Sequence, residues 1–202
     1  MEEKWKAFKE EIVGETKLKV RDMLREEGII GRGETSQSTD IIEDVANKVK
    51  ERIDEENNKE KRKNNIVMYV VPESEKEAEE ERNEDDWNIC RKIISEGLKV
   101  RREDAVITEV IRLGQINDNG RYRPLLVKFR NEQEKWKVLS QSKRLKESPQ
   151  EFLRKVKLNK DLTKKERENG KILVEQLWEK RNQGDDTWQI KNGKLVKKTL
   201  TE

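Results

Sequence analysis

Apolar and polar residues alternate along the ten residues RYRPLLVKFR, from Arg121 to Arg130. At the two-residue period of a β-strand, one side carries Leu125, Val127 and Phe129, and the other carries Leu126, Lys128 and Arg130. The pattern predicts a strand with one face in the core and a largely basic face in solvent. Basic residues on a solvated face suit an anionic partner.

Three further strands and two helices are predicted around this strand. The β-rich runs are NNIVMYVVPESE from residue 64, ITEVIRLG from residue 107 and RKVKLNKD from residue 154. Apolar residues at helical spacing mark helices in DDWNICRKIISEGL (Trp87, Cys90, Ile93, Ile94, Leu98) and NEQEKWKVLSQSKRLK (Trp136, Leu139, Lys143). The order strand, helix, strand, strand, helix, strand predicts an α+β chain with a ferredoxin-like βαββαβ domain and a hairpin turn at Asn119-Gly120.

In such a domain the helices cover one side of the sheet and leave the other side open. Alternation predicts a helix-facing row of Ile66, Met68, Val70, Ile111, Leu113, Leu125, Val127, Phe129, Val156 and Leu158. The predicted open row is Val67, Tyr69, Arg112, Leu126, Lys128, Arg130, Lys155 and Lys157. Five of these eight residues are basic and none is acidic, which favours a polyanion-binding surface over the alternative, an ordinary solvated face in a chain that is 44% charged.

A ferredoxin-like unit with a nucleic-acid-binding sheet resembles the RNA-recognition motif. In that family, aromatic residues on the first and third strands stack on bases. This chain departs from the pattern, because Val67, Pro124 and Leu126 occupy the stacking positions. Tyr69 is the aromatic residue that remains on the predicted open face.

Five short runs together resemble the RNA-binding protein encoded by the first reading frame of LINE-type retrotransposons. They are NNIVMYVVPESE, EVIRLGQ, RPLLVKFRNEQEKWKVL, KLNKDLTKKEREN and NGKLVKK, which span about two thirds of the chain. The resemblance implies a trimerising coiled coil, an RNA-recognition-like domain and a C-terminal domain that coat single-stranded nucleic acid and act as a strand-exchange chaperone. It also implies RNA-binding roles for Arg112 and Arg167. The N-terminal segment departs most from the family.

Histidine is absent, and the single cysteine is Cys90. This composition excludes the usual zinc sites, Ser-His-Asp triads and Cys-His pairs, and no G-x-x-x-x-G-K-[ST] loop is present. Nine acidic residues between Glu73 and Asp86 are a candidate divalent-ion site, but the run lacks apolar framing and is interpreted as a solvated loop and helix start. We therefore predict a binding protein without enzymatic activity, cofactor or metal.

The 202 residues are 31% apolar, with a mean hydropathy of −1.15. This is enough for one compact domain with helical appendages. No apolar run is long enough to cross a bilayer, and MEEKWKAFKEE lacks the hydrophobic stretch of a signal peptide. We expect an intracellular protein without a membrane partner, in a cytoplasmic ribonucleoprotein and with the nucleus as a further location.

Three domains are predicted: a helical segment over 1–62, with a coiled coil as one alternative, the RNA-recognition-like domain over 63–160, and a C-terminal helix and hairpin over 161–202. Charge is uneven along the chain. Net charge is −2 for residues 1–63, −1 for 64–152 and +6 for 153–202. Thr163 and Glu166 predict a capping box, and Asn192-Gly193 a hairpin turn. The candidate nucleic-acid-binding residues are Tyr69, Arg112, Arg121, Arg123, Lys128, Arg130, Lys155, Lys157, Lys160, Lys164, Lys165 and Arg167.

Two amphipathic helices are predicted in the N-terminal third, one from Trp5 to Leu24 and one from Ile42 to Ile53. We expect the chain to self-associate through them. Two functions stay open. The first is sequence-tolerant binding of single-stranded RNA or DNA, through phosphate neutralisation rather than base readout. The second is a protein-interaction scaffold built on an RNA-recognition-like domain that has lost base stacking.

Overall fold

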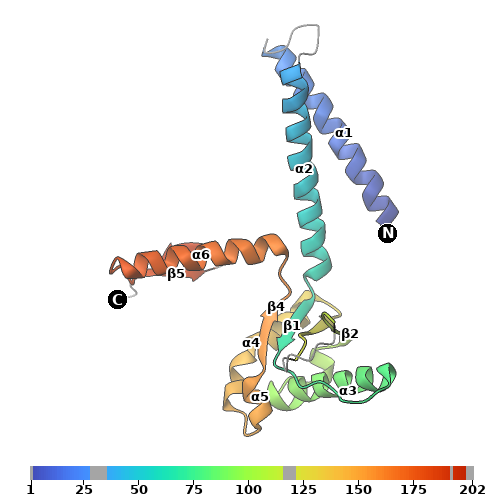
Figure 1. Ribbon diagram of the computed structural model, residues 1–202, viewed down its shortest axis with the longest axis vertical. Coiled ribbons are helices and arrows are strands. Elements are labelled where there is room, and N and C mark those ends of the chain that lie inside the picture. Colours follow the sequence, from blue (N-terminus) through green and yellow to red (C-terminus); the bar gives the residue numbers. More distant parts are fainter. Residues whose placement is uncertain (1, 28–35, 116–121, 192, 199–202) are drawn as a thin grey trace. The chain divides into compact units, whose positions relative to one another are not determined.

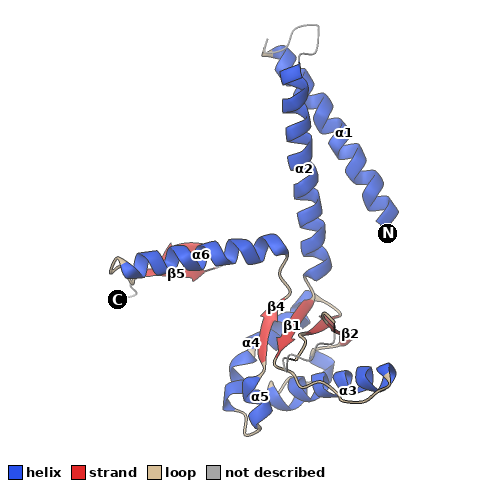
Figure 2. Ribbon diagram, viewed as in Figure 1, coloured by secondary structure: helices blue, strands red, loops and turns tan. Residues whose placement is uncertain are grey.

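The computed structural model describes residues 2–27, 36–115, 122–191 and 193–198. They form two compact units, residues 1–60 and 61–202. The predicted boundary after residue 62 lies close to the division between the units, and the further boundary after residue 160 stays a prediction. The larger elements, shown in Figures 1 and 2, are α1 (Glu2–Glu26), α2 (Ser36–Arg62), β1 (Asn65–Tyr69), α3 (Glu79–Lys92), β2 (Ile107–Arg112), β3 (Leu125–Phe129), α4 (Glu132–Ser140), α5 (Glu151–Lys155), β4 (Lys157–Lys160), α6 (Lys164–Asn182), β5 (Trp188–Lys191) and β6 (Lys194–Lys197).

The first unit is a pair of helices, α1 and α2. Ion pairs join Lys9 to Asp54 and Lys17 to Glu43, so the two helices run in opposite directions. Among the described residues of this unit, the buried apolar side chains are those of Ile42 and Ala46. Large apolar side chains stay exposed on both helices, at Trp5, Phe8, Leu18, Met23 and Ile41. The helix pair therefore leaves much of its apolar surface in solvent.

The second unit contains a four-stranded sheet in the order β2-β3-β1-β4. β1 pairs antiparallel with β3 and β4, and β2 pairs antiparallel with β3. Short turns of other helix types link the elements: a π-helix at Ile93–Gly97 and 3₁₀ helices at Arg102–Asp104 and Ser142–Glu147. A separate two-stranded sheet is formed by β5 and β6. The predicted α+β class is confirmed.

The core lies between the four-stranded sheet and the helices. The strand period places Ile66 and Met68 of β1 and Leu125, Val127 and Phe129 of β3 in this core. They pack with apolar residues of the helical segments, including Cys90, Ile93, Leu98, Val138, Leu145 and Leu153. On β1 the opposite face is also buried at Val67, which is 5% exposed. The helix-facing row predicted for β3 is confirmed, as are Ile66 and Met68 on β1. The prediction for Val70 is wrong: it follows the end of β1, adopts a left-handed φ of 60° and is exposed. Trp136, which was predicted on the packing stripe of its helix, is exposed instead.

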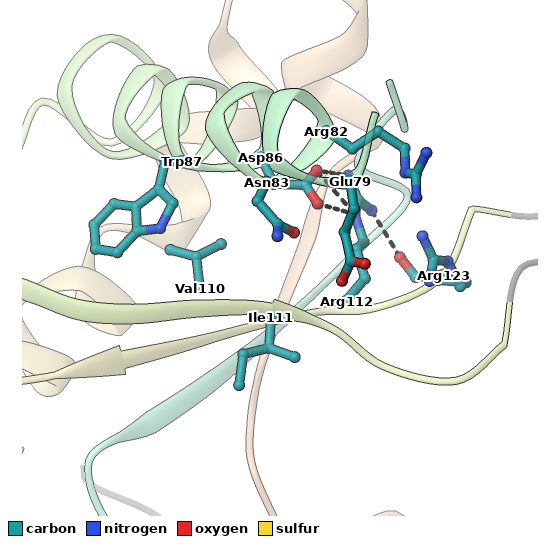
Figure 3. A pocket seen from close by; sticks show the side chains of 9 residues that line it. All are labelled: Glu79, Arg82, Asn83, Asp86, Trp87, Val110, Ile111, Arg112 and Arg123. Carbon is teal, nitrogen blue, oxygen red and sulfur yellow. Dashed lines mark hydrogen bonds and ion pairs between the residues drawn. The ribbon is translucent and has the colours of Figure 1, made fainter. Parts of the chain in front are cut away.

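The prediction for β2 is wrong, because its faces are inverted. Val110 packs against the core, whereas the side chains of Ile111 and Leu113 are exposed. The register with β3 shifts at an irregularity between Ile107 and Glu109. A shift of one residue moves every following side chain to the other face, so Arg112 points toward the helices. Figure 3 shows Val110 and Ile111 on opposite sides of the strand.

The fourth strand begins later than predicted. Residues 154 and 155 end helix α5, and Lys155 forms an ion pair of 2.7 Å with Glu151 one turn earlier. Lys155 therefore does not lie on the sheet, which corrects its predicted place in the open row. In the register with β1, Lys157 lies beside Tyr69 and Leu158 beside Met68.

The helix α6 begins with the predicted capping box. Thr163 Oγ1 accepts a hydrogen bond from the Glu166 N–H, and Glu166 Oε2 accepts one from the Thr163 N–H. β5 and β6 form a hairpin whose Gly193 has a φ of 69°, a left-handed conformation that suits glycine, while Asn192 lies outside the described residues. The predicted packing side of α6 is correct in part: Leu173 and Leu177 are half-buried, but Val174 and Trp178 are exposed.

Candidate nucleic-acid interface

Arg112 is the center of a buried polar network. Its Nε donates to both carboxylate oxygens of Asp86 on α3, at 3.0 and 3.1 Å, and its Nη2 donates to Asp86 Oδ1 at 2.7 Å (Figure 3). The remaining guanidinium hydrogens reach three backbone carbonyls, those of Val71, Pro72 and Arg123. The Arg112 side chain is 5% exposed and that of Asp86 9%. A guanidinium has five N–H donors, and all are used here.

Arg112 is therefore not available to a phosphate, which corrects its predicted place on the binding surface. It connects β2 to α3 and to the turn after β1. The turn itself is strained, because Val70 has a φ of 60° and a β-branched residue rarely adopts this conformation. A cleft between α3 and β2 surrounds the network, and Figure 3 shows Asn83, Trp87 and Val110 along it.

Arg123 is also held by protein groups. It forms an ion pair of 2.8 Å with Glu73, and its backbone N–H also donates to that carboxylate. Burial alone would raise the pKa of Glu73, but the hydrogen bonds and charge of Arg123 outweigh burial and lower the pKa below its ordinary value. Arg121 lies outside the described residues.

The open face of the sheet is apolar at its centre. Ile111 on β2, Leu126 on β3 and Val67 on β1 are cross-strand neighbours in one row. Beside this row lie Tyr69 and Leu113, both partly exposed. Two of the five basic residues predicted on this face, Arg112 and Lys155, lie elsewhere.

The other predicted cations of the third strand are present but have acidic neighbours. Lys128 lies on the open face with its ammonium 3.8 Å from Glu109 of β2. Arg130 follows the end of β3 and donates two hydrogen bonds to the buried carboxylate of Glu134. Both side chains are well exposed, so they keep contact with solvent. Their charge is largely balanced by these neighbours.

A concentrated positive charge occurs in residues 154–167, which we call the basic segment. It comprises the end of α5, the edge strand β4 and the first turn of α6. The segment contains seven lysines and arginines and two carboxylates, for a net charge of +5. The basic residues are Arg154, Lys155, Lys157, Lys160, Lys164, Lys165 and Arg167.

Both carboxylates of the basic segment serve the fold. The Asp161 side chain is 7% exposed, pairs with Arg62 and accepts a hydrogen bond from Asn65 Nδ2. Glu166 belongs to the capping box of α6. The ammonium groups of Lys157 and Lys165 are exposed and have no ion-pair partner within the described part of the chain. The basic segment therefore presents cations to solvent while its anions face the protein.

The remaining cations of the segment are also accessible. Lys164 is 3.9 Å from Glu168 and its side chain is highly exposed. Arg167 donates one hydrogen bond to the Leu162 carbonyl and keeps the rest of its donors exposed. Lys160 lies on the helix side of β4, with its ammonium 4.3 Å from the centre of the Trp136 ring. Of the twelve predicted site residues, the structure thus brings six cations together on the basic segment and places Tyr69 beside it.

The thiol of Cys90 is buried, and burial raises its pKa to about 12, so it is not a nucleophile at neutral pH. Among the described residues, no group of three or more acidic or cysteine side chains is arranged to hold a metal ion. Nor does any helix in the described ranges have the length and apolar character needed to span a membrane.

Comparison with the sequence models of protein families gives no match, and comparison with the curated proteins gives none either. The case for a function therefore rests on the geometry and charge of the second unit.

Proposed function

We propose that this chain is a sequence-tolerant single-stranded RNA- or DNA-binding protein, with no enzymatic activity, whose phosphate contacts lie on the basic segment. The observation that carries the proposal is the asymmetry of charge in residues 154–167, where both carboxylates have structural partners and the cations face solvent. Phosphate neutralisation by lysine and arginine dominates binding of this type. Among the described residues of the open face, Tyr69 is the one aromatic side chain, so base readout contributes little specificity.

The sheet order supports a finer proposal, a ferredoxin-like domain of the RNA-recognition type. That fold needs a βαββαβ chain order and antiparallel neighbours, and the observed order β2-β3-β1-β4 is compatible with both. A retrotransposon ribonucleoprotein component with nucleic-acid chaperone activity, located in the cytoplasm or the nucleus, remains the biological role that we propose.

Self-association through α1 and α2 is part of the same proposal. Exposed Trp5, Phe8, Leu18 and Met23 leave apolar surface that a second copy would bury. Several copies on one nucleic-acid strand would bind with higher apparent affinity than one copy, since each binding event raises the local concentration of the next.

A filter-binding titration of the full chain with poly-uridine at several salt concentrations tests the proposal. The affinity should fall steeply as salt rises, with a slope of about −0.7 per phosphate contact for a single strand. The variant Lys157→Gln/Lys165→Gln should bind more weakly and with a shallower slope. A matched control is Lys143→Gln/Lys146→Gln, which removes two exposed lysines outside the basic segment. Salt-independent affinity, or equal losses in both variants, would contradict the proposal.

A second candidate function is a protein-interaction module. Apolar side chains on the open face favour it, because a face that binds only phosphates has no need of them. In the row of Ile111, Leu126 and Val67, Ile111 is exposed and Leu126 is half-buried, whereas Val67 is buried. The titration separates the candidates, because a protein-interaction module predicts no salt-dependent binding of poly-uridine.

A further inference from the structure

Trp136 is an exposed aromatic residue on the helix side of the sheet. Its side chain lies on α4 and is 43% exposed, although the helix buries its neighbours Lys135 and Val138. The indole N–H donates a hydrogen bond of 3.1 Å to Glu132 Oε1, one turn earlier on the same helix. This bond holds the ring in one orientation. An indole that is both oriented and exposed is suited to contact with a planar ligand.

Two ammonium groups lie close to the Trp136 ring. The Lys160 nitrogen is 4.3 Å from the ring centre and the Lys135 nitrogen 4.9 Å, both within the range of cation–π contacts. Lys135 is fixed: its side chain is 5% exposed, and its ammonium donates to the Lys63 carbonyl and to Glu132. Lys160 is exposed and has no carboxylate partner in the ranges that the structure describes.

The position of Lys160 connects Trp136 to the basic segment. Along the edge strand β4, Lys157 lies on the open face beside Tyr69, and Lys160 lies on the helix side against Trp136. The edge strand therefore has a lysine next to an exposed aromatic ring on each of its two faces. The negative charge of Glu132 is offset by Lys135, which is 3.2 Å away.

We infer that Trp136 is a base-stacking residue for single-stranded nucleic acid, and that Lys160 contacts the adjoining phosphate. This inference rests on the proposed function. A strand that follows the basic segment around the β4 edge would place one base on the Trp136 ring. Stacking of this kind is tolerant of sequence, because every base has a π face.

The test compares side chains that differ in the ability to stack. Trp136→Phe keeps an aromatic ring, and Trp136→Leu keeps an apolar side chain without one. Poly-uridine affinity should fall about tenfold in Trp136→Leu, by the same factor at each salt concentration, and should change much less in Trp136→Phe. Trp178→Leu is the matched control, because its indole is 60% exposed but has no ammonium over its ring among the described residues. Lys160→Gln should instead make the salt slope shallower.

The outcomes separate this inference from the proposed function. If the unaltered chain binds poly-uridine in a salt-dependent manner but Trp136→Leu binds equally well, stacking is refuted and the proposed function stands. Equal losses in the Leu and Phe variants also refute stacking, because the aromatic ring then has no role. If the unaltered chain does not bind at any salt concentration, the proposed function itself fails. Melting temperatures of both variants establish that the domain is folded in each comparison.

Discussion

Replacing Arg112 should lower the stability of the second unit, because its guanidinium is committed to the fold rather than to a nucleic-acid surface. The variant Arg112→Met keeps a long apolar side chain but removes the guanidinium that Asp86 and three backbone carbonyls contact. Asp86 would remain as a buried carboxylate without its partner, because it is 9% exposed in the pair. Removing one member of a buried ion pair costs about 3–5 kcal/mol. Whole domains are stable by only about 5–15 kcal/mol, so this loss is a large share of the total.

Urea denaturation measures this loss as a fall in the free energy of unfolding. The matched control is Arg144→Met, the same substitution at an exposed arginine without an ion-pair partner in the described ranges, where we expect a change below about 0.5 kcal/mol. The double variant Arg112→Met/Asp86→Leu should recover much of the loss, because apolar residues of similar volume can replace a buried ion pair. If Arg112→Met unfolds at the same urea concentration as the unaltered chain, two conclusions are refuted: that Arg112 is buried against Asp86, and that it lies on the helix side of β2.

Four smaller predictions concern other parts of the fold. Val127→Asp should prevent folding, since it places an unpaired carboxylate in the core, and circular dichroism would detect this as lost secondary structure and cooperative melting. Val70→Gly should raise the free energy of unfolding by about 1 kcal/mol by relieving the left-handed strain, whereas Val70→Ala should not. Thr163→Ala should cost about 1 kcal/mol through loss of the α6 cap, measured by urea denaturation. Deletion of residues 1–60 should leave the second unit folded and reduce self-association in sedimentation; a monomer both before and after deletion would contradict this.

The sequence predicts the order of the elements, the core row of β3 and the buried pair Ile66 and Met68 of β1, because their signals are local. Leu125, Val127 and Phe129 alternate strictly with other residues, and the burial of one row follows from that period. The capping box of α6 is equally local, since its two members are three residues apart.

The errors occur where a distant partner decides the outcome. On β2, apolar residues at 110, 111 and 113 lie on both faces, so periodicity alone does not select the buried one. Asp86, which lies 26 residues away, settles the choice by pairing with Arg112. The pattern of the fourth strand fails at Lys155 for a different reason, because the alternation continues into the last turn of α5.

Edge protection is a simpler explanation for lysines on β4, since charged side chains on edge strands prevent pairing with other chains. Edge protection explains why β4 carries charged side chains, but it does not explain why those side chains are positive. The opposite edge strand, β2, has Glu109 exposed and the cation of Arg112 buried against Asp86. On β4 the exposed charges, Lys157 and Lys160, are both positive, and the nearby anion Asp161 is turned inward. Edge protection would be served by either sign, so two exposed lysines on β4, followed by Lys165 and Arg167 at the start of α6, favour the proposed anionic partner along this edge.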